Sequence, residues 1–196
     1  NGDGNGDFSG SLGANTAAEF TRQRDKLIAA LSALDAGILG VTRIENDPYG
    51  PASALADLVG GLNSLPAGVT YAAIDPGAGV TWGGAAATVG IIYRPDRVIP
   101  IGTPQKPTTG AFAEPLLAGY VPMAQTFEEI TWGERFTVVV YDLPARDDCP
   151  ADGLDADQGD GQGCWNALRT QAATALLAWL DDDPTGSRDP DFLWIG

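Results

Sequence analysis

The chain has 196 residues, of which 26 are acidic, 11 are basic and none is histidine, so its formal net charge at pH 7 is −15. Because histidine is the commonest general base, zinc ligand and partner of a nucleophile, its absence argues against serine-triad and zinc-dependent hydrolases. No apolar run approaches the roughly 18 residues that a membrane-spanning helix needs, so no membrane partner is expected. So acidic a surface repels phosphate backbones unless metal ions intervene.

The length and the 44% share of hydrophobic residues fit one domain with a hydrophobic core. Residues 1–15 consist mainly of Gly, Asp, Asn and Ser and are predicted to be a flexible lead-in, so the domain is assigned to residues 16–196. No signal peptide is visible, as expected for a mature or truncated form.

Three helices are predicted from apolar spacing. Thr16 and Glu19 form a capping-box pattern that opens an amphipathic helix over residues 17–35, with Phe20, Leu27, Ile28, Leu31 and Leu34 on its apolar face. Pro51 suits the first turn of a second helix that closes at Pro66. A third helix is predicted over residues 165–180, with Leu168, Ala172, Leu176 and Trp179 facing inward.

Strands are predicted between the helices, and residues 102–120 are predicted to be loop. In the strand over 87–94, Val89, Ile91 and Tyr93 are expected to alternate with Gly90 and Ile92. The mixture of helices with antiparallel-looking strand pairs predicts an α+β domain with helices outside a sheet core. The predicted strands are 38–44, 69–74, 87–94, 98–101, 123–127, 136–143 and 192–195.

Two cysteines, Cys149 and Cys164, flank a Gly/Asp-rich segment. A disulfide between them is predicted, which implies an oxidising, extracellular location; two free thiols in a reducing compartment are the alternative. Within the segment, Asp152, Asp155 and Asp157 alternate with small residues, and residues 1–7 do the same. Both stretches are candidate Ca²⁺ loops, although neither has a closing Glu, and plain acidic turns are the alternative.

Six segments, taken in chain order, resemble the endonuclease/exonuclease/phosphatase superfamily, and most of all its large extracellular bacterial nucleases. The resemblance implies a deoxyribonuclease-I-like fold, a two-sheet β-sandwich flanked by helices and here incomplete at both ends. It also implies phosphoester hydrolysis with a divalent metal, usually Mg²⁺, and nucleic acid as the partner. The segments are residues 24–31, 44–47, 89–95, 123–127, 136–140 and 159–170.

The chain departs from the family pattern at two functional positions. Arg43 stands where the resemblance places a metal-binding Glu, and a guanidinium cannot ligate a cation. Tyr141 and Asp142 stand where it places an Asn-His pair. The family's opening strand would precede residue 1, and its further phosphate-site segments would follow residue 196. The resemblance therefore predicts an impaired or inactive hydrolytic site.

Five residues remain candidates for whatever chemistry the site retains. Glu45 is either a replacement metal ligand or a loop carboxylate, and Asp142 is either a ligand or base or a solvated strand end. Arg43 either grips a phosphate or pairs with Asp142. Asn166 and Arg169 lie three positions apart on one side of the third predicted helix, near the substrate groove in relatives; Arg169 is alternatively a structural ion-pair partner.

Three functions stay open. The first is a nuclease-like domain with an impaired site, and the second is a non-catalytic binding or assembly module on the same fold. The third is an active phosphodiesterase with a rearranged site. The predicted strand 192–195 bears on the second, because a hydrophobic sheet edge invites pairing with another copy.

Overall fold

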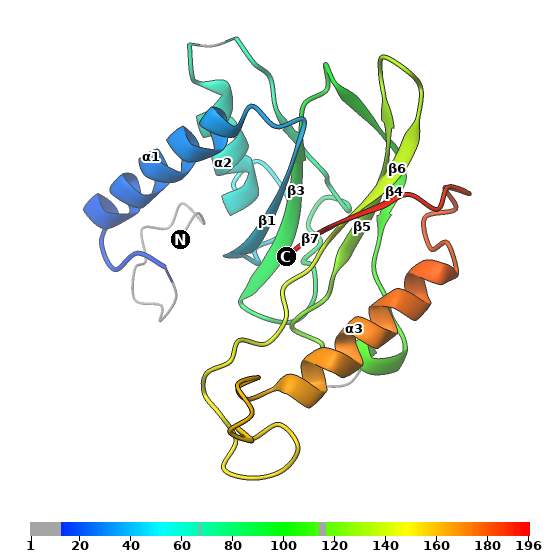
Figure 1. Ribbon diagram of the computed structural model, residues 1–196. Coiled ribbons are helices and arrows are strands. Elements are labelled where there is room, and N and C mark those ends of the chain that lie inside the picture. Colours follow the sequence, from blue (N-terminus) through cyan, green and yellow to red (C-terminus); the bar gives the residue numbers. More distant parts are fainter. Residues whose placement is uncertain (1–12, 67, 114–116) are drawn as a thin grey trace.

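The computed structural model is a layered sandwich in which two sheets face each other and helices cover both outer surfaces (Figure 1). α1 (Ala17–Leu34) and α2 (Ala54–Asn63) lie on one side, and α3 (Asn166–Asp181) lies on the other. The predicted α+β architecture of two sheets flanked by helices is confirmed. The described residues are 13–66, 68–113 and 117–196, so most of the predicted lead-in and the candidate Ca²⁺ loop at residues 1–7 lie outside them.

The first sheet has the order β1-β3-β2 and is antiparallel. It consists of β1 (Ile38–Glu45), β2 (Ala72–Ala73) and β3 (Ala87–Tyr93). β3 is the central strand, and every residue from Thr88 to Ile92 is buried. The alternation expected in β3 is therefore wrong, because α2 covers one face of this strand and the second sheet covers the other.

The second sheet has the order β4-β5-β6-β7. Its strands are β4 (Val98–Gln105), β5 (Met123–Glu129), β6 (Arg135–Val140) and β7 (Phe192–Ile195). The first three are antiparallel, whereas β7 pairs parallel to β6. The antiparallel pair expected from residues 123–127 and 136–143 is present, and the parallel pairing of β7 was not predicted. α3 lies in the connection between β6 and β7, and such a helical crossover is what parallel neighbours require.

Local side chains explain where the first two helices begin. Thr16 Oγ1 accepts the Glu19 N–H at 3.1 Å, as the capping-box pattern predicts, while the Glu19 carboxylate takes the N–H of Asn15 at 3.0 Å. α2 does not start at Pro51. Its N-cap is Ser53, whose hydroxyl accepts an N–H of the first turn at 3.2 Å, and Pro51 lies in the preceding turn.

An ion-pair network ties the end of α1 to the turn between β3 and β4. Asp35, the left-handed C-cap of α1, binds Arg94 at 2.5 Å and Arg97 at 2.8 Å. Arg94 is buried and also binds Asp96 at 2.7 Å. Arg94 and Arg97 lie in the turn between β3 and β4, which belong to different sheets. The network therefore connects the end of α1 to the point where the chain passes from one sheet to the other.

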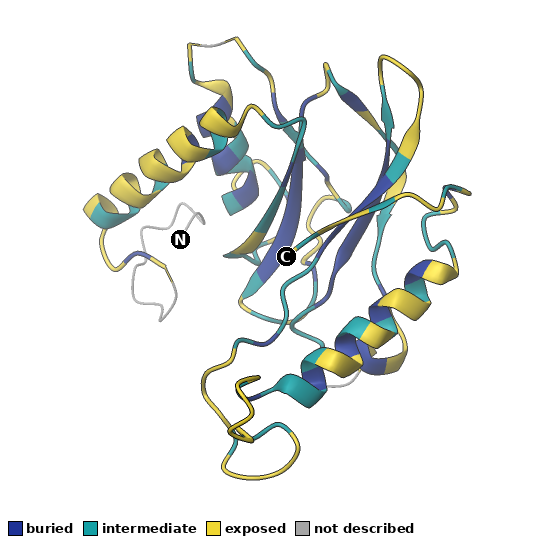
Figure 2. Ribbon diagram, in the orientation of Figure 1, coloured by how far each residue is buried: buried dark blue, intermediate teal, exposed yellow. Residues whose placement is uncertain are grey.

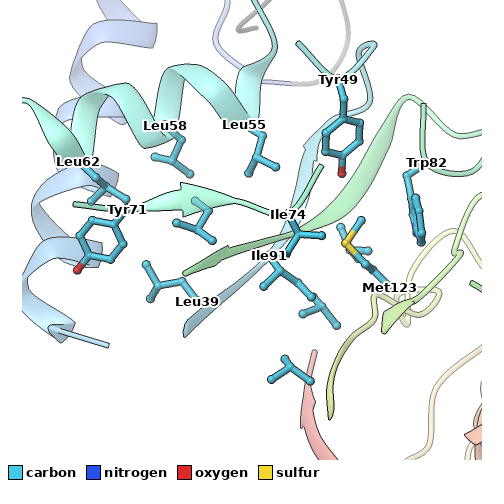
Figure 3. Packing of buried hydrophobic residues seen from close by; sticks show 14 of the residues in the cluster. Leu39, Tyr49, Leu55, Leu58, Leu62, Tyr71, Ile74, Trp82, Ile91 and Met123 are labelled. Carbon is cyan, nitrogen blue, oxygen red and sulfur yellow. The ribbon is translucent and has the colours of Figure 1, made fainter. Parts of the chain in front are cut away.

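The core lies between the two sheets and beneath the helices, as the burial colours in Figure 2 and the packed side chains in Figure 3 show. Phe127 of β5 is fully buried, with the Tyr93 ring 5.6 Å and the Phe136 ring 6.3 Å away. The sheets lie close together at Gly40, where an added Cβ would lie 2.7 Å from Ile195 and 2.9 Å from Val140. Only glycine fits this position.

The helices use their apolar residues less completely than predicted. Leu27 and Leu34 of α1 are 48% and 65% exposed, so only part of the expected apolar face is covered. On α3, Leu168, Ala172 and Leu176 are buried as predicted, Trp179 is partly buried against the same cluster, and Leu180 is buried in addition. None of the helices in the described part of the chain combines the length and hydropathy needed to span a bilayer.

Candidate functional site

The end of β1 carries a bulge that shapes the candidate site. Val41 pairs with Gly90 and Ile44 pairs with Thr88, so two residues of β1 stand opposite one residue of β3. One of the two is Arg43, which has a φ of 55° in the left-handed region. Bulges bend a strand and re-aim its side chains, and a left-handed conformation is strained for any residue with a Cβ. The strain is therefore concentrated at Arg43.

The bulge also decides where Glu45 points. Glu45 pairs with Ala87, which shares a face of β3 with Val89 and Ile91. That face is turned toward the second sheet, because Gly40, which pairs with Ile91, meets Val140. Glu45 is therefore the last residue of a strand and not the loop carboxylate that was one alternative. Without the extra residue that the bulge inserts into β1, the side chain of Glu45 would lie on the face of the first sheet that the helices cover.

An ion pair joins the two sheets at this end of the sandwich. Arg43 Nε lies 3.4 Å from Asp142 Oδ2, and the two side chains are 59% and 27% exposed. Asp142 follows the end of β6, so the pair bridges a strand of the first sheet and the exit from the second. Of the two roles considered for Arg43, pairing with Asp142 is the one in the structure. At this exposure the ion pair contributes little stability.

A pocket of about 310 Å³ opens beside Arg43. One wall is the segment that follows β6, the other is the start of α3, and Arg43 and Tyr120 complete it. Its volume is at the small end of the range for small-molecule sites. The lining residues are Arg43, Tyr120, Pro144, Ala145, Asp147, Asp148, Trp165 and Leu168.

The disulfide Cys149–Cys164 joins the two walls of this pocket. The Cα atoms are 5.3 Å apart, and the predicted pairing is confirmed. Cys164 is fully buried, and the neighbouring Trp165 donates its indole N–H to Asp147 O at 2.9 Å. The bond closes the acidic segment into a loop, so that both walls of the pocket are held at one covalent point.

Asp155 caps α3 from within that loop. The N-cap residue Trp165 has a left-handed backbone and no capping side chain, and Asp155 Oδ1 instead accepts the Leu168 N–H at 2.8 Å. Asp157 Oδ1 accepts the N–H of Gly159 at 2.9 Å, and Asp152 is exposed. Within the described ranges, no group of three or more Asp, Glu, Cys or His side chains is placed to share a metal. Ca²⁺ binding by Asp152, Asp155 and Asp157 stays a prediction.

Arg169 serves the scaffold of the site. Its guanidinium donates to the carbonyl oxygens of Cys164 at 2.7 Å, Gln162 at 2.9 Å and Pro144 at 3.4 Å. These acceptors are carbonyls of the disulfide loop and of the pocket wall, in place of the carboxylate partner considered from the sequence. Asn166, the first residue of α3, is half-buried one residue from Trp165.

Two residues that sequence reasoning left without a role build the wall next to Glu45. Asn46 Oδ1 accepts the Trp82 N–H at 2.9 Å, and Asn46 Nδ2 donates to Ala85 O at 2.8 Å. Asp47 Oδ2 accepts the N–H of Ala54 at 2.8 Å and so caps α2. The signal was present, because an Asn and an Asp directly after a strand are typical of such backbone-binding turns.

The divalent metal that the resemblance implies does not fit the residues at its expected position. A metal there needs oxygen or nitrogen lone pairs, whereas Arg43 offers five N–H donors and a positive charge. The neighbouring Asp142 is engaged with this guanidinium. No hydrolytic step through a metal at this position can be derived.

No protein-family model matches the sequence, and the search of curated proteins finds no relative. Solved structures do match. An endonuclease/exonuclease/phosphatase family protein from Bacteroides thetaiotaomicron has a TM-score of 0.53 at 10% identity, over 88% of this chain and 53% of that one. The human Nocturnin catalytic domain has a TM-score of 0.51 at 17% identity, over 85% of this chain and 53% of that one. A protein of the same family from Bacteroides vulgatus has a TM-score of 0.51 at 14% identity, over 84% and 53%.

The chain thus spans about half the length of the proteins whose structures it matches. At these identities the likeness concerns the fold alone. The two facing sheets and the helices on both outer surfaces agree with it. The chain has the deoxyribonuclease-I-like fold of the endonuclease/exonuclease/phosphatase proteins.

Proposed function

We propose that this chain is a nuclease-like domain of an extracellular protein, related to the large bacterial nucleases, whose phosphoester-hydrolysing site is impaired. The observation that carries the proposal is the ion pair between Arg43 and Asp142. It occupies the positions at which the resemblance places a metal-binding Glu and a proton-handling His. A fixed cation repels Mg²⁺, and no histidine exists in the chain to activate water.

The disulfide Cys149–Cys164 supports the extracellular location, because such bonds persist in oxidising compartments. Nucleic acid is the partner that the fold suggests. With a net charge of −15, the chain would need divalent cations to bridge it to a phosphate backbone. Binding of a fluorescent duplex should therefore require millimolar Mg²⁺ or Ca²⁺ and should be lost on chelation.

Cleavage of supercoiled plasmid DNA in Mg²⁺ and in Ca²⁺ tests the proposal. We expect no nicking above the buffer control by the unmodified chain, and nicking that depends on metal and enzyme concentration would contradict an impaired site. The double variant Arg43→Glu, Asp142→His restores the family's residue types, and Arg43→Gln is the matched control that only removes the charge. We expect calorimetry to detect Mg²⁺ binding that the double variant gains and Arg43→Gln lacks.

A binding or assembly module is the second candidate, and the edge strand β7 favours it. Within the described part of the chain β7 pairs only with β6, and Leu193 and Trp194 are 55% and 39% exposed. A cleft of about 540 Å³ beside it is lined by apolar side chains that include Ile38 and Phe136. Light scattering after size exclusion tests self-assembly: a dimer that Leu193→Lys disrupts would support this candidate, and a monomer at high concentration would oppose it.

A further inference from the structure

The pocket of about 310 Å³ beside Arg43 combines charges of both signs with aromatic rings. We call it the Arg43–Trp165 pocket. Apart from its charged and aromatic residues, the described residues that line it are apolar. A small pocket with such a lining suits a molecule that carries two opposite charges and an apolar group. The charged and aromatic residues are Arg43, Asp147, Asp148, Tyr120 and Trp165.

Backbone strain is concentrated around this pocket. Within the described ranges, six residues other than glycine have a positive φ, and three of the six line the pocket. These three are Arg43 at 55°, Asp148 at 50° and Trp165 at 61°. Non-glycine residues held in the left-handed region cluster at sites that clamp ligands, where the surrounding structure fixes them. The strained residues supply one cation, one anion and one aromatic ring.

The acidic wall is attached to the aromatic wall on both sides of Asp148. The indole N–H of Trp165 donates to the carbonyl oxygen of Asp147, the preceding residue, at 2.9 Å. Cys149, the following residue, forms the disulfide with Cys164, which is the neighbour of Trp165 in the chain. Asp148 is therefore held close to Trp165 through both of its neighbours. A carboxylate close to an aromatic ring is a combination that recognises an organic ammonium group.

The charged groups of the pocket can still bind a ligand. The Arg43 side chain is 59% exposed, and its 3.4 Å contact with Asp142 is longer than an ordinary charge-assisted hydrogen bond. A ligand carboxylate that binds the guanidinium with two parallel hydrogen bonds would be held more strongly than Asp142 is. The exposed side chain of Asp148 has no hydrogen-bond or ion-pair partner among the described residues.

We propose that the Arg43–Trp165 pocket binds a zwitterion of the α-amino acid type with an apolar side chain. The ligand carboxylate binds Arg43, and its ammonium group binds Asp148 and the adjacent Asp147. The ligand side chain packs against the rings of Trp165 and Tyr120. The net charge of −15 repels a simple anion, and the guanidinium repels a simple cation. This binding needs no metal and goes beyond the nucleic-acid binding proposed above.

Three ligands of nearly the same shape test whether both charges are required. L-phenylalanine carries both, 2-phenylethylamine lacks the carboxylate, and 3-phenylpropanoate lacks the ammonium group. By calorimetry at pH 7 we expect a Kd below about 1 mM for L-phenylalanine and binding at least about tenfold weaker for each analogue, because each loses a charge-assisted interaction. The proposal would be overturned if L-phenylalanine did not bind, or if either analogue bound as tightly.

Substitutions assign each ligand charge to its residue. Arg43→Gln should bind L-phenylalanine and 2-phenylethylamine with equal affinity, because the carboxylate has lost its partner. The double variant Asp147→Asn, Asp148→Asn should bind L-phenylalanine and 3-phenylpropanoate equally, and asparagine tolerates the left-handed backbone at position 148. If these variants keep the preference for the zwitterion, the assignment is wrong.

Arg146→Gln and Asp152→Asn are the matched controls, because they remove the same charges from exposed residues outside the lining. Both should keep the affinity and the preference of the unmodified chain, and a similar loss in them would show that charge acts from a distance. The Trp165 indole signal in a ¹H–¹⁵N spectrum, assigned through Trp165→Phe, locates the ligand. It should shift saturably with L-phenylalanine while the signals of the other four of the five tryptophans stay in place. Shifts of other indole signals in its stead would overturn the proposal.

Discussion

Arg43 reaches across the sandwich to Asp142, with 3.4 Å between Nε and Oδ2, from a backbone whose φ is 55°. The side chain thus forms a weak, solvent-exposed contact, and the backbone beneath it is strained. The strain does not arise from the ion pair, because it belongs to the bulge that sets the register of Ile44 and Glu45. Backbone and side chain at this position can therefore be tested separately.

Replacing Arg43 with glycine and with alanine separates the two effects. Both variants lose the ion pair, but only glycine relieves the left-handed conformation. We expect Arg43→Gly to be more stable than Arg43→Ala by about 1 kcal/mol in the free energy of unfolding. Urea denaturation followed by tryptophan fluorescence measures the difference, and equal stabilities would show that residue 43 leaves the left-handed region in solution.

Reducing the disulfide should lower the stability of the chain markedly. Cys149 and Cys164 are separated by 15 residues, and closing a loop of this size contributes roughly 3 kcal/mol. We expect the Tm to fall by about 6–12 °C in a reductant, and to a similar extent in the Cys149→Ala, Cys164→Ala double variant. The double variant should be insensitive to reductant. An unchanged Tm after thiol titration has confirmed reduction would contradict this expectation.

The carboxylate of Asp155 should contribute more to the stability of the chain than the other carboxylates of the same loop. It caps α3 through Leu168, so Asp155→Ala should cost about 1 kcal/mol. Asp157→Ala is the matched control, because Asp157 binds only Gly159 within the loop and its loss should have a smaller effect. Denaturant midpoints of the two variants measure this, and a loss of equal size in both would assign the effect to loop charge.

Acid should weaken the corner built by Asp35, Arg94, Asp96 and Arg97. Hydrogen bonds from Arg97 hold the pKa of Asp35 below its ordinary value of 3.8, and those from Arg94 do the same for Asp96. A lowered pKa in the folded state means that the stabilisation is present above about pH 4 and is lost as the pH falls through the folded values. Urea midpoints measured from pH 6 to pH 2.5 should therefore decline most steeply at the acid end.

Two variants test whether this corner causes the fall of the urea midpoint at low pH. Asp35→Asn removes the titrating group and keeps a residue that tolerates the left-handed cap, so its midpoint should depend less on pH. Arg97→Gln removes the cation and should flatten the same part of the curve. If both variants keep the slope of the unmodified chain, other carboxylates govern its acid sensitivity.

The sequence predicted most elements because their periodicities are local. Thr16 with Glu19, and the Val-rich run of β6, each carry their signal within a few residues. The misses concern tertiary partners. β3 lost its expected alternation because both its faces are covered, and the parallel pairing of β7 depends on where α3 leads the chain. A short apolar run shows neither whether both faces of a strand are covered nor in which direction the strand pairs.

The sequence predicted which residues belong to the candidate site, but it did not predict how the backbone places them. Arg43, Asp142 and both cysteines could be singled out, and the structure brings Arg43 to Asp142 and Cys149 to Cys164. The bulge could not be foreseen, because an Arg gives no sign of a positive φ where a Gly would. The capping of α3 by Asp155 was equally hidden, since its partner Leu168 lies beyond the disulfide loop.

The parallel pairing of β7 with β6 has a consequence for how the chain opens. β7 follows α3 in the chain and pairs with β6, and α3 packs on the same β6 through Val139. Helix and strand are therefore expected to unfold together as one cooperative unit while the antiparallel strands stay paired. Amide hydrogens of α3 and β7 would then exchange at a common rate, faster than those of β3 at the centre of the other sheet.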